Sequence, residues 1–226
     1  MCSRFCGNDC RQGNLFTSIE RGGIRDLIGG TGIQTSNQAP TELAQVLVDH
    51  SGALSLIAAK WGFPITGRPL IINARAETVL ERGLFADAAK KRRCLIPVSG
   101  FYEWDKNANP KQPFCFRMAD ESPFALAGLW RRCEDQIEFV ICTTEPNELL
   151  EKYHNRMPSI IDREEYGTWL FGETEEAVSL AIEPFRAEKM KSYAVTRAMG
   201  NPRYKSEDAH QPVLDLFGEK ATGSLF

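Results

Sequence analysis

Cys2 is the residue whose place in the chain suggests the most specific chemistry. It follows Met1 directly, so removal of Met1 would leave a free α-amine and a thiol on adjacent carbons. The α-amine has a reference pKa of about 7.7–8.0 and a cysteine thiol one of about 8.5. Such a pair captures an aldehyde, because the amine forms a Schiff base and the thiol then closes a five-membered thiazolidine ring in an intramolecular step. The alternative is that Cys2 belongs to an unstructured terminus and has no chemical role.

A second set of polar residues alternates along residues 71–77. If this segment is extended, Asn73, Arg75 and Glu77 share one face, and Ile72, Ala74 and Ala76 share the other. Three polar groups of different kinds on one strand face indicate a site. The alternative is a solvated strand face that carries an ion pair.

Glu103 and His154 are the candidate proton carriers. Glu103 lies within Gly-Phe-Tyr-Glu-Trp, residues 100–104, where burial beside aromatic rings would raise its pKa toward neutrality. It could instead be an exposed residue of an amphipathic strand. His154 is one of three histidines and precedes Arg156 by two positions. A neutral imidazole there could transfer protons, although a histidine after a helix is often a capping or surface residue.

Metal binding is the less favoured interpretation of the N-terminal cysteines. Cys2, Cys6 and Cys10 recur every four residues and would share one face of a helix. The set lacks a clear fourth ligand and the C-x₂-C spacing that is typical of zinc sites. We therefore expect no metal and no cofactor.

Short apolar segments between turn residues predict a sheet that must position these side chains. Strands are expected over residues 44–48, 54–61, 94–98, 113–117, 124–130, 137–143 and 193–196. Helices are expected over residues 17–28, 146–153, 162–170 and 173–182. The sum is a single α+β domain over residues 1–226, with a mainly antiparallel, barrel-like sheet flanked by helices.

Composition narrows the class of protein. The 226 residues carry a net charge of −3, which argues against a protein that coats duplex DNA but leaves room for a local basic site. We expect no membrane span and no secretory signal, and hence an intracellular location. Seven cysteines in that setting are expected to be reduced.

The order of several short motifs resembles the SOS-response-associated peptidase (SRAP) family from Cys2 to the C-terminal region. The matching segments are Met1-Cys2-x-Arg4-Phe5, Asn37-x-Ala39-Pro40, Trp61-Gly62, Ile72-Asn73-Ala74-Arg75-x-Glu77, Gly100-Phe101-Tyr102-Glu103-Trp104, His154-x-Arg156-Met157-Pro158, and Val195 followed by Gly200-Asn201-Pro202. No single motif is decisive, but the combination is specific.

The resemblance implies a protein that acts as a monomer on single-stranded DNA with an abasic site, located in the cytoplasm or nucleoid, or in the nucleus of a eukaryote. The opened sugar offers an aldehyde, which the N-terminal cysteine converts to a thiazolidine. By motif position, Cys2 is the nucleophile, Asn73 orients the sugar, Glu103 handles protons, and His154 assists Schiff-base formation and reversal. The resemblance also implies self-removal of Met1 and a weak lyase activity.

The same resemblance implies a set of DNA contacts. Arg4, Arg75 and Arg156 would hold phosphates, and Pro40 and Trp104 would pack near displaced bases. Several positions depart from the family pattern. Ser3 replaces a usual glycine, Ser36 replaces a frequent tyrosine, and residues 62–71 lack a tryptophan pair found in some relatives. Phe63 or Arg68 could replace the stacking that this pair provides.

Two other functions stay open at this point. One is a conventional cysteine hydrolase in which His154 activates the Cys2 thiolate, so that the α-amine would not matter. The other is a non-catalytic single-stranded nucleic-acid binder, whose binding would be reversible, salt-sensitive and indifferent to an abasic site. Blocking the α-amine while leaving the thiol intact separates the first from a thiazolidine former.

Overall fold

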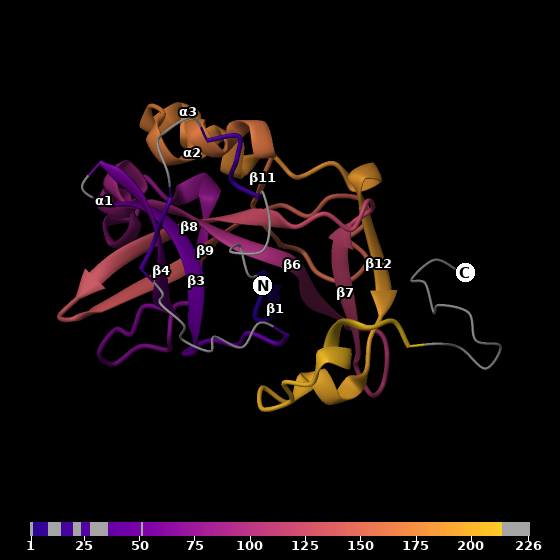
Figure 1. The fold of residues 1–226 in the computed structure, drawn as a ribbon. Coiled ribbons are helices and arrows are strands. Elements are labelled where there is room, and N and C mark those ends of the chain that lie inside the picture. Colours follow the sequence, from indigo (N-terminus) through magenta and orange to yellow (C-terminus); the bar gives the residue numbers. More distant parts are fainter. Residues whose placement is uncertain (1, 9–14, 20–23, 28–35, 51, 214–226) are drawn as a thin grey trace.

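The computed structural model describes residues 2–8, 15–19, 24–27, 36–50 and 52–213. Figure 1 shows a molecule dominated by β-structure, with the α-helices α1, α2 and α3 at one side and the β7–β12 pair at the other. None of the described helices is both long enough and apolar enough to cross a membrane.

Strands account for most of the regular structure. Twelve strands of the described chain form one sheet: β1 (Phe5–Gly7), β2 (Arg25–Asp26), β3 (Leu43–His50), β4 (Ala53–Trp61), β5 (Asn73–Arg75), β6 (Arg93–Asp105), β7 (Gln112–Met118), β8 (Phe124–Cys133), β9 (Gln136–Thr144), β10 (Met157–Pro158), β11 (Ile160–Ile161) and β12 (Met190–Ala194). The described α-helices are α1 (Gly83–Lys91), α2 (Tyr166–Phe171) and α3 (Thr174–Ile182).

Five of these strands close into a barrel. Their order is β8-β9-β4-β3-β6, and β6 returns to pair with β8. Only the β4–β9 pairing within this ring is parallel, and the others are antiparallel. The expectation of an α+β fold around a mainly antiparallel barrel is therefore confirmed.

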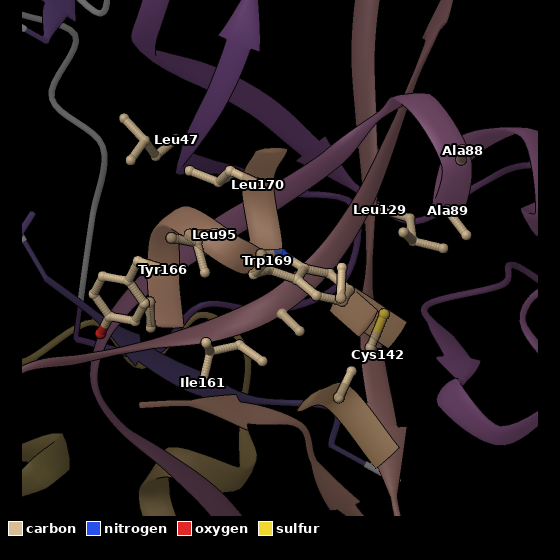
Figure 2. Packing of buried hydrophobic residues seen from close by; sticks show 14 of the residues in the cluster. Leu47, Ala88, Ala89, Leu95, Leu129, Cys142, Ile161, Tyr166, Trp169 and Leu170 are labelled. Atoms are coloured by element: carbon tan, nitrogen blue, oxygen red, sulfur yellow. The ribbon is translucent and has the colours of Figure 1, made fainter. Parts of the chain in front are cut away.

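Alternation along the barrel strands separates two cores. Leu95 belongs to a cluster that includes Trp169 and Leu170 from α2, whereas its neighbour Ile96 belongs to a second cluster. Because side chains alternate across a strand and the helices lie outside the barrel, the second cluster fills the barrel interior. Figure 2 shows Trp169 packed among Leu95, Leu170 and Cys142 in the outer core. Cys2 belongs to the inner cluster.

The 13-residue strand β6 links the barrel to the candidate site. Its first half pairs with β8, and its second half pairs with β1 and β7 beyond the barrel. Gly100 lies at this transition. A Cβ on Gly100 would lie 2.8 Å from the carbonyl oxygen of Phe116 and 3.2 Å from Sγ of Cys115, so a glycine is needed for β7 to pack this closely.

Every expected strand is present, some with longer or shifted bounds. The segment expected at residues 94–98 continues to Asp105, and the late strand runs from Met190 to Ala194. The expected helix over residues 162–170 begins as a 3-10 turn, Arg163–Glu165, before α2. The helix expected over residues 173–182 is α3.

Two expected helices are wrong. Within residues 17–28, Arg25–Asp26 form β2, which pairs in parallel with β4, and the two glycines at positions 22 and 23 disfavour a helix. Residues 148–153 form turns that do not continue as an α-helix, and two hydrogen bonds hold the Asn147 side chain that precedes them. Its Oδ1 accepts the Leu150 N–H at 3.0 Å, and its Nδ2 donates to the Phe185 carbonyl at 2.7 Å.

Helix α1 was not expected from the sequence. Phe85, Ala88 and Ala89 are spaced to form its buried face, and alanine is a strong helix former. Arg93 follows the helix and donates to the carbonyls of Ala89, Trp169 and Gly172, which lie at the C-terminal ends of α1 and α2.

Candidate functional site

An open cavity of about 710 Å³ brings three distant segments together. They are the N-terminal segment, the end of β6 with its following loop, and the turn after Tyr153. The lining residues are Ser3, Arg4, Glu103, Trp104, Lys106, Lys111, Tyr153, His154 and Asn155. Glu103 and His154, which lie 51 positions apart in the sequence, therefore face one space.

Cys2 is anchored by Asn73, behind this cavity. Asn73 Nδ2 donates a hydrogen bond to the Cys2 carbonyl at 2.9 Å, and the Cys2 thiol donates to the Arg4 carbonyl at 3.6 Å. The Cys2 side chain is fully buried among the apolar residues of the inner core. Burial, followed by the negative charge of Glu103, raises the pKa of the thiol far above its ordinary value. The thiol is therefore protonated at neutral pH.

Asn73 also offers an acceptor beside Cys2. It begins β5, whose parallel pairing with β9 at Ile141 fixes its position. With Nδ2 committed to Cys2, Oδ1 is buried and has no hydrogen-bond partner among the described residues. A buried acceptor without a partner is costly, so this oxygen is available to an N–H or O–H group of a ligand.

Glu103 has the properties of a proton donor at neutral pH. The side chain is only 4% exposed and lies on the same face of β6 as Phe101, which belongs to the inner core with Cys2. Burial raises the pKa of its carboxyl to about 7. The pKa therefore shifts in the expected direction, and its cause is burial.

His154 is held by the turn that contains it. The preceding Tyr153 ring packs against Phe114 and Phe116, with centroid distances of 4.7 and 5.2 Å. The Arg156 backbone N–H donates to Nδ1 of His154 at 3.0 Å, which places the proton of a neutral ring on Nε2. Partial burial lowers the pKa of His154. The lowered pKa favours the neutral form of the ring.

The expected DNA-contacting residues are distributed unevenly. Arg4 and Trp104 line the cavity, whereas Pro40, Arg75 and Arg156 do not. Arg75 is exposed and Pro40 is half-buried.

Arg156 makes a two-pronged ion pair with Glu77, at 2.6 and 2.8 Å, and also donates to the Thr143 carbonyl. The guanidinium therefore ties the His154 turn to the segment that follows β5. The second polar set also differs from its expected form, because Glu77 lies in a 3-10 turn, Ala76–Thr78, beyond the three-residue strand.

The structure bears on the expectations about the cysteines and about a metal site. Cys6 lies in the strand β1, so a helical face shared with Cys2 does not form, and Cys10 is outside the described residues. No group of three metal-binding side chains occurs in the described parts of the chain. Cys2, Cys6, Cys94, Cys115, Cys133 and Cys142 are free thiols.

Sequence reasoning missed several residues of the site. Lys106, Lys111 and Asn155 line the cavity but lie in turns without periodicity. The role of Asn37 was also missed. Its buried Nδ2 donates to the carbonyls of Met199 at 2.9 Å and Tyr204 at 3.0 Å. Asn37 of the Asn-x-Ala-Pro motif therefore binds the backbone of the segment that contains the Gly-Asn-Pro motif.

Comparisons with known proteins agree on one family. The family model described as SOS response associated peptidase (SRAP) matches residues 1–202. The Abasic site processing protein YoqW of Bacillus subtilis is 32% identical over 187 residues, which cover 76% of this chain and 83% of that protein. The Abasic site processing protein YedK of Escherichia coli is 28% identical over 225 residues, 94% of this chain and 100% of that protein.

A solved structure supports the fold independently. The crystal structure of a protein from Bacteroides thetaiotaomicron aligns with a TM-score of 0.75 at 23% identity, covering 94% of this chain and 100% of that one. At this identity the likeness extends to the fold alone.

Proposed function

The chain belongs to the SOS response associated peptidase family, whose relatives YoqW and YedK are named abasic site processing proteins, and we propose that it cross-links to abasic sites in single-stranded DNA through Cys2. The observation that carries this proposal is the Asn73 hydrogen bond to Cys2, whose chain neighbours Ser3 and Arg4 line the same cavity as Glu103 and His154. We expect the protein inside the cell, acting as a monomer.

The proposed reaction begins with removal of Met1. Hydrolysis of the Met1–Cys2 amide consumes one water and frees the α-amine. This hydrolysis is the peptidase step. The amine then adds to the aldehyde carbon of the opened sugar, and loss of one water gives a Schiff base. The Cys2 sulfur adds to the same carbon while the thiol proton moves to nitrogen, which closes the thiazolidine. The net change from processed protein and DNA is the loss of one water.

Asn73 and two cavity residues, Glu103 and His154, support these steps in different ways. Glu103, protonated near neutral pH, can donate a proton to the departing oxygen and recover it from the amine. Asn73 Oδ1 can accept the N–H of the Cys2 amine or a sugar hydroxyl. His154 provides a second proton carrier for formation and reversal of the Schiff base. The same Schiff base permits β-elimination, so a weak lyase activity competes with ring closure.

The proposed DNA contacts combine charge and stacking. Arg4 contributes positive charge at the cavity and Trp104 a ring on which a base can stack. Arg75 and Pro40 would meet the strand outside the cavity. Arg156 would act mainly through its contacts with Glu77 and the His154 turn.

A buried, protonated thiol disfavours the alternative of a thiolate-based hydrolase.

The test of the proposed cross-linking is to incubate Met1-processed protein with an abasic single-stranded oligonucleotide and to separate the products on a denaturing gel. We expect a heat-stable adduct with wild type, none with Cys2→Ala, and none with undamaged DNA. Glu103→Gln should form it at least tenfold more slowly, since general acid–base catalysis contributes roughly 10²–10⁴-fold. A stable adduct with Cys2→Ala, or none with wild type, contradicts the proposal.

A further inference from the structure

The loop between β6 and β7 places two lysines side by side at the rim of the cavity. β6 ends at Asp105 and β7 begins at Gln112, and these two residues are paired across the hairpin. Lys106 and Lys111 are the next residues on either side, so the antiparallel pairing holds their backbones close together. Both side chains are exposed, and both line the cavity.

These two ammonium groups differ from most other lysines of the described chain. Lys91, Lys189, Lys191 and Lys205 each form an ion pair with a carboxylate. No ion pair of Lys106 or Lys111 occurs within the described residues. The nearby Asp105 carboxylate accepts the Asn107 backbone N–H at 2.8 Å, so it shapes the loop.

The balance of charge at the cavity favours an anion. Among the described residues of its lining are three permanent cations, Arg4, Lys106 and Lys111, and one carboxyl group, that of Glu103. Glu103 is buried behind the rim, whereas the lysines are exposed. Like charges opposite each other in a hairpin are destabilising, and an anion bound between them removes this cost. This local excess contrasts with the net charge of −3 for the whole chain.

We infer that Lys106 and Lys111 form a phosphate subsite that holds one backbone phosphate beside the abasic nucleotide. The inference rests on the proposed function, because the abasic sugar must pass this cavity to reach Cys2, which precedes the cavity-lining Ser3. Trp104, two residues before Lys106, also lines the cavity, so the hairpin can offer a stacking surface and a phosphate contact to adjacent parts of one strand.

The test measures reversible binding, so that it does not depend on cross-linking. The probe is a single-stranded oligonucleotide with a tetrahydrofuran abasic analogue, which has no aldehyde. We expect Lys106→Gln/Lys111→Gln to bind more weakly and to reduce the slope of log K against log salt by about 0.7, which is the value for one phosphate contact in a single strand. The double arginine variant should retain the wild-type slope. Lys90→Gln/Lys91→Gln on α1 makes the same charge change away from the cavity and should also leave the slope unchanged.

A second measurement locates the phosphate. Single neutral methylphosphonate linkages are placed at successive positions around the analogue, and one position should weaken binding to wild type but not to the double glutamine variant. The inference is overturned if the double glutamine variant has the wild-type slope, or if every neutral linkage weakens both proteins equally. The adduct assay with aldehyde-bearing DNA remains a separate test, so a failed subsite and a failed cross-linking mechanism are distinguishable.

Discussion

The carboxyl of Glu103 carries a proton at a pH where an exposed glutamate has lost it. Burial in β6 causes this change, because the charged form cannot be solvated there. The same burial keeps the Cys2 thiol protonated, so the proposed chemistry begins at the amine and uses sulfur second. Asn73 connects the two halves of this site, since one amide group anchors Cys2 and presents an acceptor.

The raised pKa of Glu103 makes the stability of the fold depend on pH. The pKa rises from 4.5 when unfolded to about 7 when folded, so folding takes up a proton between these values. This contribution to stability is present below pH 4.5 and is lost as the pH rises to 7. Glu103→Gln has no carboxyl that titrates, so it does not show this loss of stability. The free energy of unfolding of the variant, relative to wild type, should therefore increase by on the order of 3 kcal/mol over this range.

Urea denaturation at a series of pH values measures this difference. Glu145→Gln, at an exposed position, is the matched control and should give a nearly constant difference from wild type. A constant difference for Glu103→Gln as well would mean that Glu103 is not buried in its neutral form.

At the scale of elements, two connections keep the site in place. The ion pair between Glu77 and Arg156 joins the His154 turn to the 3-10 turn that follows β5, and the Arg156 N–H orients the imidazole. On the other side of the barrel, Arg93 joins α1 and α2 to the start of β6 through three backbone carbonyls. Carbonyls at helix ends have no partner within the helix, so one guanidinium satisfies groups from both helices.

Replacement of Arg93 by methionine should destabilise the fold strongly. Methionine fills similar space but leaves the carbonyls of Ala89, Trp169 and Gly172 without their donor. A loss of about 2–4 kcal/mol in the free energy of unfolding is expected, since each buried group left unsatisfied costs about 1–3 kcal/mol. Chemical denaturation measures the loss, with Arg132→Met at an exposed position of β8 as the control. Equal stability of the two variants would contradict this account of α1 and α2.

At the scale of the whole molecule, contacts between distant segments complete the architecture around the cavity. Asn37 binds the segment from Met199 to Tyr204, and Lys205 binds Glu42 in return. An acidic chain with a basic cavity rim is suited to select a local DNA structure and avoids general attraction to the phosphate backbone.

The sequence predicted the strands better than it predicted the contacts that support the four candidate reactive residues, whose roles stay a prediction. Strand alternation is a local signal, and it predicted the barrel. The residues around Glu103 are also a local signal, and they predicted the direction in which the pKa of Glu103 shifts. One wrong helix lies where Arg25–Asp26 pair with β4, a contact between distant segments, and the other lies where residues 148–153 remain turns before β10. The partners Glu77 and Arg156 lie 79 positions apart, so only the fold brings them together.

The central claim is that Cys2 reacts through both its amine and its sulfur, and intact mass spectrometry tests it directly. Met1-processed protein is mixed with an abasic single-stranded oligonucleotide, beside a matched sample whose α-amine is acetylated and whose thiol is free. The account predicts a product with the summed masses less one water in the first sample, stable to hydride reduction, and no such product in the second. An equally abundant adduct in the acetylated sample would contradict the account.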